Sequence, residues 1–84
     1  MKEFFVTFRS ITFAQRGQAA LRSGGISSSM ARTPRWMEEK GCGYSLRVGG
    51  AHGQEAVALL KKRAIPYSKI YKQGESGEME EIML

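Results

Sequence analysis

The stretch FFVTFRSITFAQRGQAALRSGG, residues 4–25, decides the fold class because its hydrophobic period changes partway along it. At its start, Phe4, Val6 and Phe8 alternate with other residues, and this period of two in aromatic and β-branched residues predicts a strand. From residue 13 the period is helical, and one stripe collects the small and apolar residues Phe13, Ala14, Gly17, Ala20 and Leu21. The stretch therefore predicts a strand followed by a helix that packs against it.

The rest of the chain repeats this pattern. We predict strands over residues 26–31, 44–48 and 67–72 and a second helix over residues 52–63. Residues 35–43 form a connecting loop. The resulting order, β-α-β-β-α-β, places the chain in the α/β class as an α+β sandwich. It is typical of the ferredoxin-like arrangement, a four-stranded antiparallel sheet with two helices on one face.

Smaller signals mark the ends of the predicted helices. Ser10 and Thr12 are both candidate N-caps for the first helix, and Gly24-Gly25 ends it. At each helix-to-strand junction a Leu and an Ile stand five residues apart: Leu21 with Ile26, and Leu60 with Ile65. Two successive strand–helix–strand halves account for this repetition.

The chain has the length of one domain, and its charged residues are distributed unevenly. Eighty-four residues suit one domain, which we assign to residues 1–73, with an acidic C-terminal tail over residues 74–84. All 13 Lys and Arg residues precede the tail, whereas the tail itself carries four Glu and no base. A basic body indicates an anionic partner, and the acidic tail could fold back and screen it.

Composition excludes several classes of protein. A single Cys cannot form an internal disulfide, and with one His and no Asp the chain has too few ligands for a zinc site. A domain of this size cannot easily enclose a large cofactor, so we expect none and no metal. No apolar run approaches the length needed to span a bilayer, so we expect no membrane association and a cytoplasmic location.

Cys42 is the candidate functional residue. Its neighbours Gly41 and Gly43 leave room for a bulky partner to approach the sulfur, and successive backbone N–H groups there can form an anion-binding concavity. The nearby Arg35 and Arg47 make the setting basic, which lowers the pKa of a thiol and raises the fraction of nucleophilic thiolate.

Other roles for this cysteine remain open. A free Cys is often a small buried core residue with no chemistry. A catalytic pair would require His52, but His52 lies beyond a strand that runs away from Cys42, so we do not expect the two to meet. No second Cys is present to resolve a disulfide, which excludes a self-contained dithiol cycle.

The pattern Thr33-Pro34-Arg35 followed by GCGYSLRV, residues 41–48, resembles a family of small bacterial domains described as selenium/sulfur carrier-like. The resemblance extends from the opening strand to Tyr71. It implies that Cys42 holds sulfur or selenium in a persulfide-type adduct, with Gly41, Gly43 and Arg47 as the supporting residues. Donor and acceptor proteins would then be the partners, and whether the chain is itself an enzyme stays open.

Two alternatives compete with the carrier hypothesis. A ferredoxin-like sheet can bind RNA through aromatics on its open face, here Phe5, Tyr67 and Tyr71, with Arg9, Arg47 and Lys69 for the phosphates. The third strand lacks the usual aromatic signature, so we consider nucleic acid unlikely as a partner. In the second alternative the open face is covered by another copy, which would make a homodimer and is compatible with a carrier.

Overall fold

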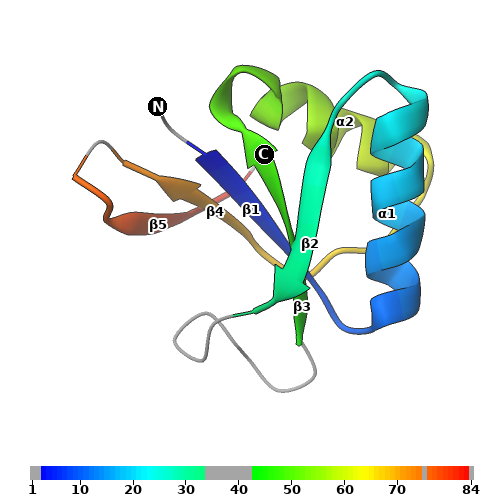
Figure 1. Cartoon of the computed structure of the whole chain (residues 1–84), viewed down its shortest axis with the longest axis horizontal. Helices are drawn as coiled ribbons and strands as arrows, with labels where there is room; N and C mark the ends of the chain where they lie inside the picture. The colour runs from blue at the N-terminus through cyan, green and yellow to red at the C-terminus, as the bar shows by residue number, and fades with distance from the viewer. Residues whose placement is uncertain (1–2, 34–42, 75, 84) are drawn as a thin grey trace.

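The change of period in residues 4–25 produces strand β1 (Glu3–Phe8) followed by helix α1 (Ile11–Ser23) (Figure 1). The computed structural model describes residues 3–33, 43–74 and 76–83. The further elements are β2 (Ser28–Arg32), β3 (Tyr44–Gly49), a short 3₁₀ turn η1 (Gly50–His52), α2 (Gly53–Lys62), β4 (Ile70–Gln73) and β5 (Met79–Ile82). The α+β class is confirmed.

The described strands form one antiparallel sheet in the order β2-β3-β1-β4-β5. The expectation of four strands is therefore wrong, because the segment left as a tail contributes β5. Glu-rich segments are poor strand formers, so β5 was not expected. It pairs with β4, and Lys69, just before β4, places its Nζ 3.4 Å from Oε1 of Glu81. The ferredoxin-like assignment stays a prediction.

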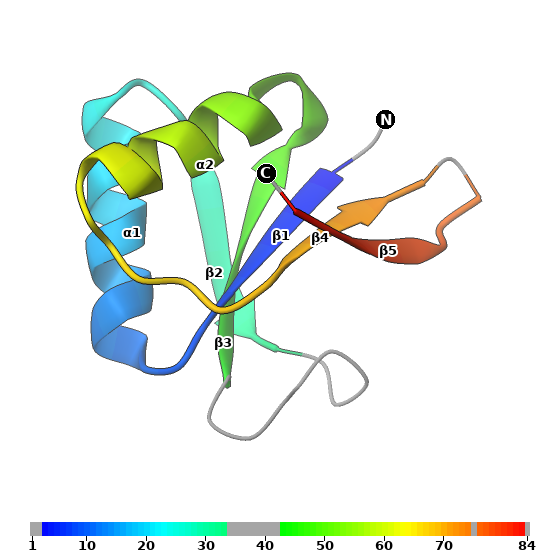
Figure 2. The same cartoon turned by 180° about the vertical axis from the view of Figure 1, so that it is seen from behind.

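Both helices cover the same face of the sheet (Figure 2). Gly17 of α1 lies against the ring of Phe8, and Gly53 of α2 lies against the ring of Phe4. Phe4 and Phe8 are four residues apart on β1 and so point to the same side. The core consists of Phe4, Val6, Phe8, Ala14, Leu21, Ile26, Leu46, Val48, Ala56, Val57, Leu60 and Ile70.

The predicted boundaries shift by a few residues. Ser10 caps α1, its side chain accepting a hydrogen bond from the N–H of Phe13, so Thr12 lies inside the helix. Ile26 precedes β2 and is buried, while Tyr67 precedes β4 and packs against the core. The buried residues of α2 are Gly53, Ala56, Val57 and Leu60, and Ala64 is exposed in the turn after the helix.

The repeated Leu–Ile spacing has a structural explanation. Just after each helix, the N–H of the Ile donates to the carbonyl of the Leu five residues earlier. The N···O distance is 2.8 Å for Ile26 and 3.0 Å for Ile65. This is the Schellman arrangement, in which the residue just before the Ile takes the left-handed conformation. That residue is Gly25 (φ 80°) after α1 but Ala64 (φ 55°) after α2.

Replacing Ala64 with glycine is therefore expected to raise the free energy of unfolding by about 1 kcal/mol, because glycine adopts a positive φ without the cost that Cβ imposes. Chemical denaturation measures this change. Gly25→Ala is the matched control: open space surrounds its added methyl group, so only the backbone cost remains, and we expect a loss of similar size. A stability of Ala64→Gly below that of the wild type would contradict this explanation.

Candidate functional site

Thr33 and Gly43 flank residues 34–42 and are hydrogen-bonded to each other at one end of the sheet. The N–H of Thr33 donates to the carbonyl of Gly43 at 3.0 Å, which continues the β2–β3 ladder one step past the pair Arg32–Tyr44. We call this region, formed by Arg9, Arg32, Thr33 and Gly43, the loop end. Cys42 precedes Gly43 directly, so its Cα is within about 3.8 Å of the Gly43 Cα.

Several predicted site residues lie outside the described residues: Arg35, Gly41 and Cys42 itself, with the helical turn expected around Trp36. Of the glycine pair, only Gly43 is described. It is half-buried, and a Cβ built on it would have no atom within 4 Å. Among the described residues, none would contact a side chain at residue 43.

The loop end contains two arginines, Arg9 and Arg32. The Arg32 guanidinium carbon lies 5.8 Å from the centre of the Tyr44 ring, within the range of a cation–π contact. Arg9 is exposed and follows Phe8, whose partner across the sheet is Tyr44. The described strand residues that border this end carry no carboxylate. The described residues of the loop end therefore carry a net positive charge, while Arg35, Glu38, Glu39 and Lys40 of the adjoining segment lie outside the described residues.

The first turn of α1 adds to this potential. Only Arg9 separates Ser10 from the end of β1, so α1 begins at the end of the sheet where β2 ends and β3 begins (Figure 1). This first turn contains no acidic residue. The N-terminus of a helix carries a partial positive charge, which favours a nearby anion such as a thiolate.

Arg47 is placed differently from the prediction. It is exposed on β3, and its Nε lies 3.5 Å from Oε2 of Glu3, the partner of Gly49 at the opposite end of the sheet. Arg47 lies four positions after Gly43 along the strand, a span of about 13 Å. The structure therefore does not bring Arg47 together with Gly43.

The profile of a family described as "Putative Se/S carrier protein-like" matches residues 3–72. The chain belongs to this family. The match runs from β1 into β4 and includes the loop end, which confirms the resemblance drawn from residues 33–35 and 41–48. No curated protein and no solved structure matches the chain.

In this carrier-like chain His52 is far from the loop end. It lies in η1, beyond the last residue of β3, whereas Gly43 precedes the first. The strand between His52 and Gly43 is about 20 Å long. Within the described ranges, no three side chains of His, Cys, Asp or Glu are grouped as metal ligands. Nor does this part of the chain contain a helix long and apolar enough to cross a membrane.

The sequence reasoning missed Arg32. It stands next to the Thr33-Pro34-Arg35 motif, but its importance comes from its pairing with Tyr44, two residues after Cys42. Arg47 was predicted to support Cys42 because the two are close along the chain. Antiparallel pairing instead places Arg32 of the preceding strand opposite Tyr44.

Proposed function

We propose that Cys42 carries sulfur or selenium as a persulfide-type adduct and passes it to a partner protein. Two observations support this. The family to which the chain belongs is described by selenium or sulfur carriage, and Cys42 is the only thiol in the chain. With no second cysteine to attack the adduct, the cargo must leave to an external acceptor.

The transfer needs no external oxidant. The Cys42 thiolate attacks the terminal sulfur of a donor persulfide, R–S–SH, and forms a bond to that sulfur as the donor S–S bond breaks. The products are Cys42–S–SH and the donor thiolate RS⁻, so one sulfane sulfur moves and the electrons balance. An acceptor thiolate then attacks the terminal sulfur of Cys42–S–SH, takes it, and releases Cys42 as the thiolate.

The loop end suits both steps. Attack requires a thiolate, and the second step regenerates one, so positive potential next to Cys42 favours the reactive forms. Arg9, Arg32 and the first turn of α1 are the described groups at this end of the sheet that could supply that potential. Among the described residues, none would contact a side chain at residue 43, which leaves that side free for a bulky donor or acceptor.

Loading tests the proposal. The chain is incubated with a cysteine desulfurase and cysteine, and its intact mass is recorded. The proposal expects a gain of one sulfur atom that a thiol reductant removes. A mass that stays unchanged while the desulfurase is active would contradict it.

The electrostatic part has its own prediction. A unit charge about 7 Å from a thiolate in water contributes about 0.6 kcal/mol, a roughly threefold change in the thiolate population. We therefore expect Arg32→Gln and Arg9→Gln each to slow alkylation of Cys42 about two- to threefold at a fixed pH below the thiol pKa and at low salt. Arg47→Gln is the matched control and is expected to leave the rate unchanged. Equal slowing by all three variants would contradict the assignment of the loop-end arginines.

The helix-free face of the sheet supports a second proposal, a homodimer. The register places Arg47, Phe5 and Tyr71 side by side in one row across β3, β1 and β4. Tyr67 packs against the core instead, so the three aromatics expected for RNA stacking do not share this face. We propose that a second copy of the chain covers this row. Sedimentation equilibrium is expected to give twice the mass of one chain, and the mass of a single chain would contradict the homodimer.

A further inference from the structure

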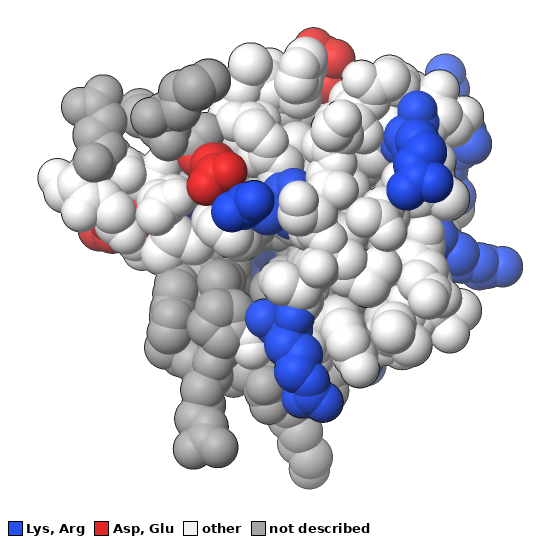
Figure 3. Space-filling view, in the orientation of Figure 1, with Lys and Arg blue, Asp and Glu red and all other residues white. Residues whose placement is uncertain are grey.

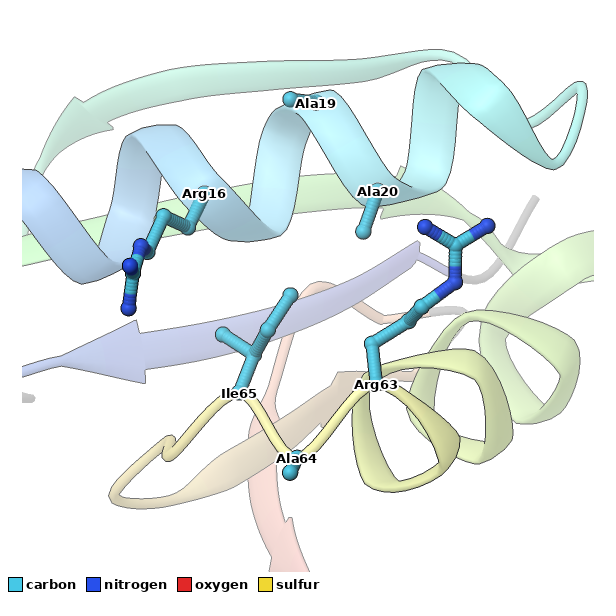
Figure 4. Close-up of a pocket in the computed structure, with 6 residues that line it drawn as sticks. All are labelled: Arg16, Ala19, Ala20, Arg63, Ala64 and Ile65. Carbon is cyan, nitrogen blue, oxygen red and sulfur yellow. The ribbon is translucent and has the colours of Figure 1, made fainter.

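A groove of about 430 Å³ separates the middle of α1 from the chain that follows α2 (Figure 4). It is lined by Arg16, Ala19, Ala20, Arg63, Ala64 and Ile65. None of these residues belongs to the loop end, and the proposed sulfur chemistry uses none of them.

The groove has a cation on either side of a small apolar floor. Figure 4 shows Arg16 extending from α1 and Arg63 extending from the end of α2, with Ala20 and Ile65 directed into the space between the two elements. Both arginines are exposed, and neither is paired with a carboxylate of the described residues. Their guanidinium groups are therefore available to an anionic ligand.

The surrounding surface strengthens the potential. The two helices and the residue after α2 carry five exposed cations, whereas Glu55 is the one acidic residue of these helices. In Figure 3 the side of the molecule formed by α1 shows Lys and Arg side chains and no acidic ones. The five cations are Arg16, Arg22, Lys61, Lys62 and Arg63.

Ala64 gives an independent indication. It holds a left-handed conformation that glycine adopts at lower cost, and it does so at a residue that lines the groove. The Schellman turn after α2 sets this conformation, and residues other than glycine that hold it cluster at binding sites. Here the side chain is a methyl group that extends the apolar lining.

We propose that this groove binds an acidic segment of a partner protein, with one apolar side chain against Ala20 and Ile65 and flanking carboxylates on Arg16 and Arg63. Guanidinium groups bind carboxylates in a forked geometry. The lining has no aromatic residue on which a base could stack, which favours a peptide over single-stranded RNA. The inference goes beyond the proposed function and holds whether or not Cys42 carries sulfur.

The test uses fluorescence anisotropy with a labelled synthetic peptide that has a central leucine flanked by glutamates. We expect Arg16→Gln and Arg63→Gln each to weaken binding about three- to fivefold, as partly exposed ion pairs do. Arg22→Gln and Lys62→Gln remove the same charge from the same helices outside the groove, and we expect them to change binding less than twofold. Replacing the central leucine with alanine is also expected to weaken binding.

Three results would overturn the inference: no binding of the peptide to the wild type, equal weakening by all four variants, or tighter binding of a single-stranded RNA oligonucleotide that depends on Arg16 and Arg63. Equal weakening would show only general charge attraction. Cys42→Ser is expected to bind the peptide like the wild type, so this experiment and the loading experiment succeed or fail separately.

Discussion

Replacing Cys42 with serine is expected to abolish sulfur loading completely. The hydroxyl group nearly preserves the size of the side chain, but it does not ionise near neutral pH and cannot form a persulfide with a donor. Because the chain has no other cysteine, no second thiol can compensate. The measurement is the intact mass of the variant after incubation with a cysteine desulfurase and cysteine.

Two controls make the loss interpretable. Thermal unfolding of Cys42→Ser should match that of the wild type, which shows that the fold is intact. Arg47→Gln, whose guanidinium lies against Glu3, should load sulfur at the wild-type rate. An adduct on Cys42→Ser equal to that on the wild type would mean that sulfur is held elsewhere, and the proposed function would fail.

Gly53→Ala is expected to lower the free energy of unfolding by about 2 kcal/mol, since the added methyl group would overlap the ring of Phe4. Phe4 lies in the core on a central strand and cannot move without disturbing its neighbours. Denaturation in urea measures the change. The contact also fixes where α2 crosses the sheet, so a relaxed variant would shift the helix.

Gly49→Ala is the matched control for this substitution. Gly49 has an ordinary φ of −58°, and its added Cβ would have no atom within 4 Å. We expect its stability to stay within about 0.5 kcal/mol of the wild type. If both variants were equally stable, close packing of α2 on Phe4 would not be what makes glycine necessary at residue 53.

Local patterns in the sequence predicted most of the fold. The alternation of Phe4, Val6 and Phe8 and the small-residue stripe of α1 each report one face of one element. Both were found buried between the sheet and the helices. The helix ends could also be predicted, because the spacing of Leu and Ile follows from the hydrogen bonds that end each helix.

What the sequence did not show depends on contacts between distant residues. The Glu-rich β5 pairs with β4, and Glu81 lies within ion-pair distance of Lys69, which precedes β4. The left-handed conformation of Ala64 could not be predicted, because alanine ordinarily adopts a right-handed one. The groove between Arg16 and Arg63 joins residues far apart in the chain, and no periodicity reports such a pair.

The candidate site divides in the same way. The resemblance carried by the motif around Cys42 correctly indicated the family, and the role of the thiol stays a proposal. The neighbouring cations could not be chosen by spacing, because Arg32 reaches the loop end through strand pairing. Arg47, on the same strand as Tyr44, is directed toward Glu3 instead.

The central claim, that Cys42 receives and releases a sulfur atom, is tested most directly by a chase. The loaded wild-type chain is separated from its donor and mixed with an acceptor thiol, and its intact mass is followed over time. We predict that the added sulfur leaves, that the mass of the free thiol returns, and that the acceptor gains the sulfur. A thiol that takes up no sulfur, or one that keeps it in the presence of acceptor, would contradict the claim.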